Sequence, residues 1–162
     1  AQSIGDTLLA TNQGTLTSQN FVTANLAVFI PFGVPEAVTI TKLFWGNGGP
    51  VAGNLDAGIY DTSGARLVST GTTGQLNTNQ VQSVDVTDTT LARGVYYLAL
   101  ASDTSGATQK VYAVVPAAGI PQGFGLLQMA AAFVLPTSAT FAAYTSAFIP
   151  LVGAQGYRTV GP

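Results

Sequence analysis

Acidic residues are the first candidates for chemistry, because they occur in two close pairs. Asp56 and Asp61 flank a predicted hairpin, and Asp85 and Asp88 lie within a Thr-rich stretch. Glycoside hydrolysis needs two carboxylates, one of them with a pKa raised by burial. On the strand pattern, however, Asp61 and Asp88 fall in turns, where an aspartate commonly caps its own backbone. We therefore do not expect paired-acid catalysis.

The chain lacks the usual partners for nucleophilic and metal chemistry. It contains no histidine and no cysteine, which removes the commonest general base, the commonest zinc ligand and any thiol nucleophile. A serine could pair only with Lys42 or Lys110, and no spacing supports such a dyad. Calcium would take oxygen ligands from loops, but no Asp-x-Asp-x-Asp loop is present. We expect a protein that is not an enzyme, with no catalytic residue, cofactor or metal ion.

Aromatic and amide side chains remain as candidates for contacts with carbohydrate. The pairs that we single out are Trp45 with Asn47, and Tyr60 with Asn54. Ring faces stack on sugars, and neutral amides supply hydrogen bonds to their hydroxyl groups. The same residues could equally pack in the core or in loops, as aromatic side chains often do. The sequence leaves both interpretations open.

Charge is scarce along the whole chain. Only 7% of the 162 residues are charged and the net charge is −2, whereas 47% are hydrophobic. Such a surface is poorly protected against association, which fits either a neutral extracellular domain or a subunit covered by its neighbours. The few basic residues are scattered, so neither nucleic acid nor an anionic membrane surface is an expected partner. No run approaches the ~20 apolar residues that a membrane-spanning helix needs.

Two turn signals, at residues 61–64 and 102–106, predict the elements that position these groups. Each combines Asp or Ser with Gly between two β-type runs. Asp or Ser can open a turn by bonding its own backbone, and Gly supplies a positive φ. We therefore expect two antiparallel hairpins. They pair residues 57–60 with 65–68, and residues 96–100 with 110–115.

Apolar periodicity extends this β pattern. Residues 54–60 alternate cleanly, and residues 95–101 are apolar on both faces, which indicates a central strand. Residues 38–45 change phase around Lys42, which indicates a β-bulge. Seven or eight short strands predict an all-β fold, an antiparallel, jelly-roll-like β-sandwich, with an immunoglobulin-like sandwich as the alternative.

We expect two parts along the chain. Residues 1–24 are polar and form an extended N-terminal arm or a weak edge strand, which could also be a frayed end. Residues 25–162 form the β-sandwich domain. Its last part is rich in Pro and Gly and is expected to be irregular.

Several segments carry a resemblance to a known class of proteins. They are residues 40–45, 53–61, 66–71 and 91–100, together with 133–136 and 148–151. On these segments the chain resembles the β-sandwich proteins common in the virions of tailed bacteriophages. Such sandwiches serve as head decoration (cement) proteins, head fibres, tail appendages and sugar-binding modules. The resemblance implies a virion or surface sandwich and transfers no functional residue, because the shared residues are those of the fold.

Size narrows this expectation. The chain has no coiled-coil stalk and no collagen-like repeat, which argues against a complete tail fibre. A small neutral sandwich suits a decoration protein on the capsid exterior, which stabilises the shell by binding across neighbouring subunits. The expected partners are the major capsid protein and copies of the chain itself, as a trimer or dimer. The alternative is a carbohydrate- or receptor-binding module of a phage tail or of a secreted bacterial protein, with an extracellular location.

Overall fold

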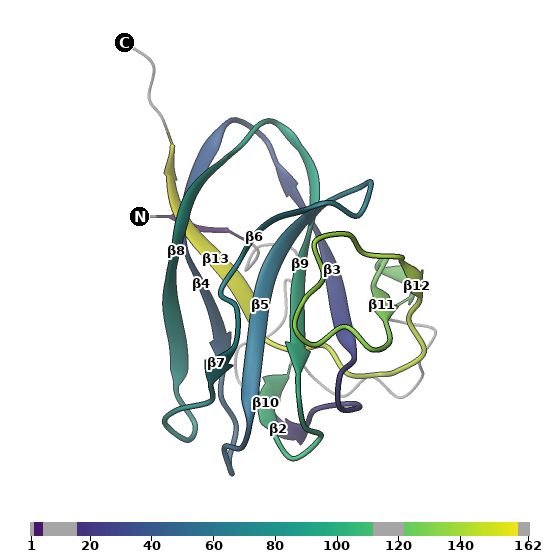
Figure 1. Cartoon of the computed structure of the whole chain (residues 1–162). Helices are drawn as coiled ribbons and strands as arrows, with labels where there is room; N and C mark the ends of the chain where they lie inside the picture. Colours follow the sequence, from purple (N-terminus) through teal and green to yellow (C-terminus); the bar gives the residue numbers. More distant parts are fainter. Residues whose placement is uncertain (1, 5–15, 112–121, 159–162) are drawn as a thin grey trace.

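The structure is a computed structural model that describes residues 2–4, 16–111 and 122–158. These residues form two antiparallel sheets that pack against each other, with a small two-stranded ribbon at one end (Figure 1). The predicted all-β antiparallel sandwich is confirmed. A jelly-roll arrangement of the strands stays a prediction.

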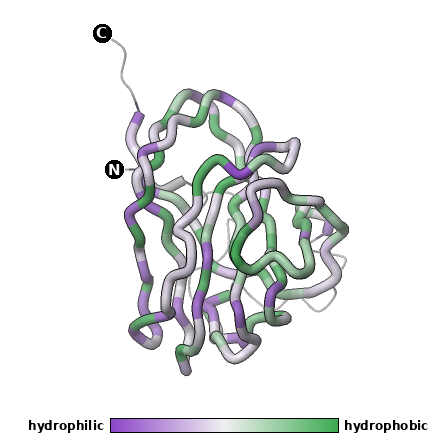
Figure 2. Tube along the Cα trace, viewed as in Figure 1, coloured by the Kyte–Doolittle hydropathy of each residue, from purple (hydrophilic) through white to green (hydrophobic). Residues whose placement is uncertain are grey.

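The smaller sheet has four strands in the order β1-β13-β4-β8. Their bounds are β1 (Gln2–Ile4), β13 (Val152–Arg158), β4 (Val38–Gly46) and β8 (Val81–Leu91). Hydrophobic and hydrophilic residues alternate along β8 (Figure 2), as in a strand with one face on the core and the other in water.

The larger sheet has seven strands in the order β12-β11-β3-β9-β5-β6, with β7 paired to the start of β5. Their bounds are β12 (Ala142–Ala143), β11 (Leu127–Met129), β3 (Ala27–Val34), β9 (Gly94–Ser102), β5 (Asn54–Asp61), β6 (Arg66–Ser69) and β7 (Thr73–Gly74). β9 lies between β3 and β5, which confirms the central strand predicted from its apolar pattern.

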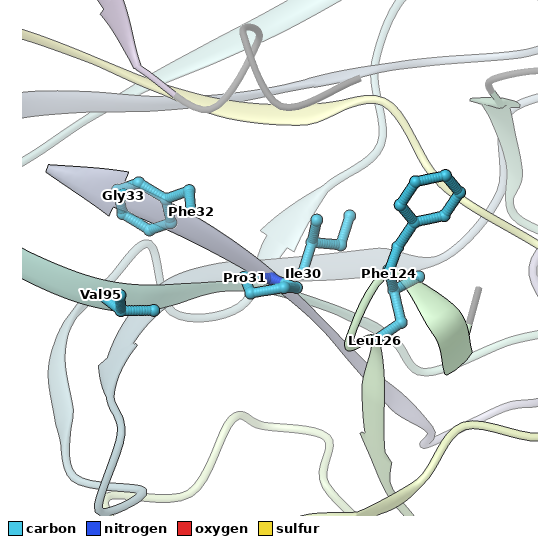
Figure 3. A pocket seen from close by; sticks show the side chains of 7 residues that line it. All are labelled: Ile30, Pro31, Phe32, Gly33, Val95, Phe124 and Leu126. Carbon is cyan, nitrogen blue, oxygen red and sulfur yellow. The ribbon is translucent and has the colours of Figure 1, made fainter. Parts of the chain in front are cut away.

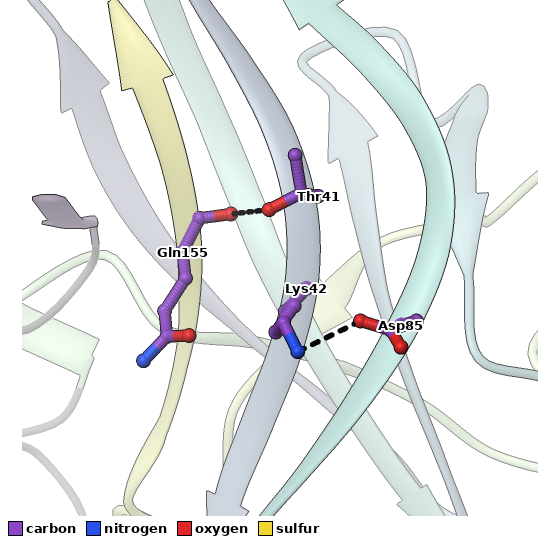
Figure 4. A network of polar contacts seen from close by, with 4 residues as sticks. All are labelled: Thr41, Lys42, Asp85 and Gln155. Atoms are coloured by element: carbon purple, nitrogen blue, oxygen red, sulfur yellow. Dashed lines mark hydrogen bonds and ion pairs between the residues drawn. The ribbon is translucent and has the colours of Figure 1, made fainter. Parts of the chain in front are cut away.

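A bulge at Thr41 keeps both halves of β4 on the core between the two sheets. The pairing of β4 with β8 shifts register between Ile40 and Lys42, which confirms the predicted bulge. Thr41 Oγ1 lies 3.5 Å from the Gln155 carbonyl oxygen, and Lys42 Nζ lies 2.9 Å from the Asp85 carboxylate on β8 (Figure 4). Opposite β13, Gln155 and Gly156 pair with Lys42 and Ile40, so Thr41 is one extra residue in β4. It brings the two halves of the strand into phase, and four of its apolar residues join the main core: Val38, Ile40, Leu43 and Trp45.

The outer face of the seven-stranded sheet carries a second apolar cluster. Residues 130–141, which we call the crossover segment, run from β11 to β12 and cover this face (Figure 1). The ring of Phe29 on β3 contacts Tyr60 on β5 and Phe141, with centroids 5.2 Å and 5.0 Å apart. The centre of this sheet is therefore buried on both faces, which explains why β9 is apolar on both sides.

The first predicted hairpin forms and the second does not. β5 pairs with β6 across the turn at residues 61–65. β10 (Thr108–Val111), however, pairs with β2 (Thr17–Asn20) instead of β9. The predicted pairing of residues 96–100 with 110–115 is wrong because β3 and β5 already occupy both edges of β9. Residues 112–115 lie outside the described residues.

The predicted N-terminal arm contributes one strand to the smaller sheet of the sandwich and one strand to the two-stranded ribbon. β1 pairs with β13, and β2 pairs with β10. Phe21, just after β2, is buried in the main core. Residues 1 and 5–15 lie outside the described part of the chain. A role for this region as an arm that reaches a neighbouring subunit stays a prediction.

Candidate functional site

Asp56 is buried on the outer side of β5, and its surroundings alter its acidity. It has no exposed surface and accepts a hydrogen bond from the Leu135 backbone N–H of the crossover segment at 3.0 Å. The Thr70 hydroxyl donates to its other oxygen at 3.3 Å. Burial raises the pKa of Asp56 above its ordinary value, although the Leu135 amide, the Thr70 hydroxyl and the Arg66 charge oppose this shift.

Two more side chains hold the same stretch of backbone. The Tyr60 hydroxyl donates to the Pro136 carbonyl at 2.5 Å, and the Arg66 guanidinium donates to the Leu135 carbonyl. We use the name carboxylate cluster for the four side chains involved: Asp56, Tyr60, Arg66 and Thr70. Their polar atoms fasten the crossover segment onto β5 and β6, which is a structural task.

The turn between β5 and β6 also packs against the crossover segment. Gly64 has a φ of +90°, and a Cβ at this position would collide with the Ala139 carbonyl oxygen. The Asp61 carboxylate accepts hydrogen bonds from the Ser63 hydroxyl at 2.6 Å, the Ser63 N–H at 2.8 Å and the Ala65 N–H at 3.0 Å. These bonds, above all that from the Ser63 hydroxyl, lower the pKa of Asp61. Asp61 is thus a turn-forming residue, as predicted.

The predicted acid pairs fall into different environments. Asp56 is buried, whereas Asp61 caps a surface turn five residues further on. Asp85 pairs with Lys42, and Asp88 is exposed. The prediction that Asp88 lies in a turn is wrong, because β8 continues to Leu91 in pairing with β4. Within the residues that the structure describes, no three side chains of metal-ligating type gather.

Trp45 and Asn47 lie in the interior, where β4 ends. Neither has any exposed surface. Asn47 Oδ1 accepts hydrogen bonds from Trp45 Nε1 at 2.9 Å and from Gln75 Nε2 at 3.1 Å. Asn47 Nδ2 donates to Gln82 Oε1 at 2.9 Å and to the Leu76 carbonyl. We use the name amide cluster for Trp45, Asn47, Gln75 and Gln82.

The amide cluster also binds the backbone around it. Gln75 Oε1 accepts from the Ala52 N–H at 2.8 Å, and Gln75 Nε2 donates to the Thr108 carbonyl at 2.6 Å. Gln82 accepts from the Leu76 N–H and donates to the Gly74 carbonyl, both at 2.8 Å. Three amide side chains thus join loops that are far apart in the sequence.

Gln109 is a buried amide that stands outside this network. It has no exposed surface, and its backbone bridges to Asn47. Neither Oε1 nor Nε2 of its side chain has a hydrogen-bond partner among the described residues. An unpartnered buried amide costs free energy.

The residues predicted to contact a glycan have roles inside the fold. The ring of Trp45 packs in the main core, and its Nε1 donates to Asn47 of the amide cluster. The ring of Tyr60 packs in the second apolar cluster and has no exposed surface. Neither ring presents a face to solvent, so in this structure neither can stack on a sugar. Asn47 uses its amide within the amide cluster. Asn54 is partly buried and donates through Nδ2 to the Asp103 carboxylate at 2.7 Å.

Four residues of these clusters were not predicted from the sequence: Arg66, Thr70, Gln75 and Gln82. The stretch at residues 70–79, which is rich in Thr, Gly and Asn, has the composition of an ordinary loop. The contacts that place them in the two clusters span 14 residues for Thr70 with Asp56, 28 for Gln75 with Asn47, 35 for Gln82 with Asn47 and 69 for Arg66 with Leu135. No local pattern marks such contacts, because only the fold brings the partners together.

The surface of the described residues carries exposed large hydrophobic side chains and few charges. The hydrophobic side chains are Leu67, Leu76, Val81, Val95, Phe124, Val134 and Tyr157. The ion pairs within this part of the chain join Lys42 to Asp85 and Arg158 to Glu36. Apolar groups that face water and are sparsely interrupted by charge suit contacts with other proteins.

Among the described residues, no helix has the length and hydropathy needed to cross a membrane. Comparison with known proteins found no matching family model and no significant match to a curated protein or a solved structure.

Proposed function

We propose that the chain is a non-enzymatic structural protein of a tailed-bacteriophage virion. In this proposal it decorates the exterior of the capsid and stabilises the shell by binding across neighbouring copies of the major capsid protein. It would do so as a trimer or dimer, because closed symmetric assemblies are the rule for such subunits. The jelly-roll type of sandwich belongs to the same proposal.

One observation carries the proposal, namely the contrast between interior and surface. Inside, the side chains that could do chemistry are engaged in the carboxylate and amide clusters. Outside, large apolar side chains such as Val95 and Phe124 face water on a chain that is only 7% charged. Such a surface favours burial against other proteins. The resemblance of residues 40–45, 53–61, 66–71 and 91–100 to phage virion sandwiches points the same way.

The test is the position and number of the chain in purified particles. Quantitative mass spectrometry should find it at a copy number of the same order as the major capsid protein. Shells stripped of the chain should melt at a lower temperature and recover when it is added back, since a ligand of the assembled state stabilises that state. A copy number on the scale of tail proteins would contradict the proposal.

A carbohydrate- or receptor-binding module is the other outcome of this test. Tail-scale copy number together with binding on a glycan array would support it. The burial of Trp45 and Tyr60 weighs against it, because these rings were the proposed stacking surfaces.

A further inference from the structure

An apolar groove lies at the C-terminal half of β3. Its lining comes from three places: Ile30, Pro31, Phe32 and Gly33 on β3, Val95 on β9, and Phe124 with Leu126 just before β11 (Figure 3). The groove has a volume of about 250 Å³. All of its lining residues are apolar, and Val95 and Phe124 are each 55% exposed.

The groove exists because the cover of the seven-stranded sheet stops short. β11 pairs with β3 only at residues 27–29, so the rest of β3 has no paired strand on that side among the described residues. Gly33 lies opposite Val95 in the β3–β9 register, and a Cβ on Gly33 would meet no atom within 4 Å. The hollow is therefore open because Gly33 has no side chain and because β11 does not extend along the C-terminal half of β3.

Arg93 gives the groove a charge at one end. A second depression shares Gly33 and Val95 with the first and is also lined by Arg93. Each of the other basic side chains has a polar partner: Lys42 pairs with Asp85, Arg158 with Glu36, Arg66 with the Leu135 carbonyl and Lys110 with Ser18 Oγ. Within the described part of the chain, Arg93 has neither an ion pair nor a side-chain hydrogen bond. An apolar floor beside an uncompensated guanidinium is complementary to an apolar group next to a carboxylate.

We propose that this groove binds an extended segment of a partner protein that presents a bulky apolar side chain followed by an acidic one. The apolar side chain fills the space above Gly33 between Val95 and Phe124, and the carboxylate meets Arg93. A side chain held by its own polypeptide suits such an open hollow, because a free small molecule would leave much of its surface in water. Only the identity of the partner, the major capsid protein, rests on the proposed function.

The test uses nuclear magnetic resonance of the full chain with a synthetic peptide as the probe. The peptide is acetylated and amidated and reads Ser-Thr-Phe-Asp-Thr-Ser, and its control carries Asn in place of Asp. Titration should shift the backbone amide signals of Gly33, Gly94 and Val95. The Asn peptide should bind about threefold to fivefold more weakly, as expected for loss of one exposed ion pair.

Two variants locate the binding on the groove. A Cβ on Gly33 meets no atom within 4 Å, so Gly33→Leu places a side chain in the hollow. It should weaken binding of the peptide at least about tenfold, as loss of one buried apolar side chain implies. Ser83→Leu adds the same side chain to an exposed position on the other sheet and should change nothing. Arg93→Gln should remove the preference for Asp over Asn, whereas Lys110→Gln, with the same loss of charge elsewhere, should keep it.

Three results would overturn the proposal. These are the absence of shifts at the three amides, binding that survives Gly33→Leu, and binding of 3-phenylpropionate at least as tight as that of the peptide. The last result would make the groove a small-molecule site. The capsid proposal is tested separately by copy number, so peptide binding together with tail-scale copy number would keep the groove and remove the capsid role.

Discussion

Two clusters of polar side chains lie in the interior of the described residues, and they differ in their chemistry. The amide cluster is built from neutral groups around Asn47, whose oxygen and nitrogen both have partners. The carboxylate cluster is built around Asp56, whose pKa is raised by burial. Neutral amides carry no proton that titrates near neutral pH, whereas a buried carboxyl group links folding to proton binding. The carboxylate cluster therefore couples stability to pH through Asp56, and the side chains of the amide cluster carry no such group.

Removal of Asn47 should have the largest effect on stability. Asn47→Ala leaves Trp45 Nε1, Gln75 and Gln82 without their shared partner in a buried site. We expect a loss of about 4 kcal/mol in the free energy of unfolding, measured by urea titration. Asn54→Ala is the matched control, and should cost about 1 kcal/mol because its amide is only partly buried. Equal losses for the two variants would mean that the cluster adds nothing beyond single hydrogen bonds.

Asp56 should come next, and two replacements separate its hydrogen bonds from its charge. Asp56→Ala removes the acceptor for the Leu135 N–H and should cost about 3 kcal/mol. Asp56→Asn keeps an acceptor oxygen and should cost about 1 kcal/mol. A similar loss in both variants would show that the charge opposite Arg66, rather than the hydrogen bond, holds the crossover segment.

Gln109 allows a stabilising change beside the amide cluster. Gln109→Met removes a buried amide that has no partner among the described residues, and should raise the free energy of unfolding by about 1 kcal/mol. Gln75→Met makes the same replacement where the amide is fully used, and should destabilise the protein. If both variants are destabilised, Gln109 has a partner that the described residues do not include.

The smallest expected effect is the change of the free energy of unfolding with pH, to which Asp56 and Asp61 contribute with opposite signs. The raised pKa of Asp56 means that the folded state holds its proton more tightly than the unfolded state. Its contribution to stability is present below the pKa of the unfolded chain and is lost as the pH rises through the folded pKa. The lowered pKa of Asp61 gives a contribution that is present above the unfolded pKa and is lost as the pH falls through the folded one.

Urea titrations from neutral pH to about pH 3 check this difference. Relative to Asp56→Asn, the wild-type chain should gain stability as the pH falls. Relative to Asp61→Asn, it should lose stability over the acidic part of the range. Parallel profiles for the two comparisons would contradict the assignment of Asp56 as a buried acid.

Local patterns in the sequence predict those parts of the fold that depend on near neighbours. The Asp61 turn, the alternation of β5, the bulge near Lys42 and the central place of β9 all follow from residues within one or two strands. The partner of β10 could not be predicted, because turn chemistry sets a change of direction but not which strand is free to pair. Both edges of β9 are occupied by β3 and β5, so β10 pairs with β2 instead.

The candidate site was harder to predict because aromatic residues look alike whether buried or exposed. Trp45 and Tyr60 are of residue types that often stack on sugars, but both are buried. The bulge in β4 turns Trp45 towards the core, and the crossover segment covers Tyr60 on β5. The groove beside Gly33 could not be predicted because it depends on groups that are absent. It depends on a missing side chain and on where β11 ends, and neither can be seen from residue types.

The position of β13 has a consequence for the synthesis of the protein. β13 lies between β1 and β4, so residues 2–4 reach their partner only when residues 154–156 have been made. Until then β4 lacks a neighbour on one edge, and part of the main core is open to water. Pairing between such distant segments slows folding and exposes unpaired strand edges. A chain released from the ribosome before β13 is made would therefore have an incomplete smaller sheet and would be prone to aggregate. Folding of the smaller sheet must wait until residues 152–158 have been translated.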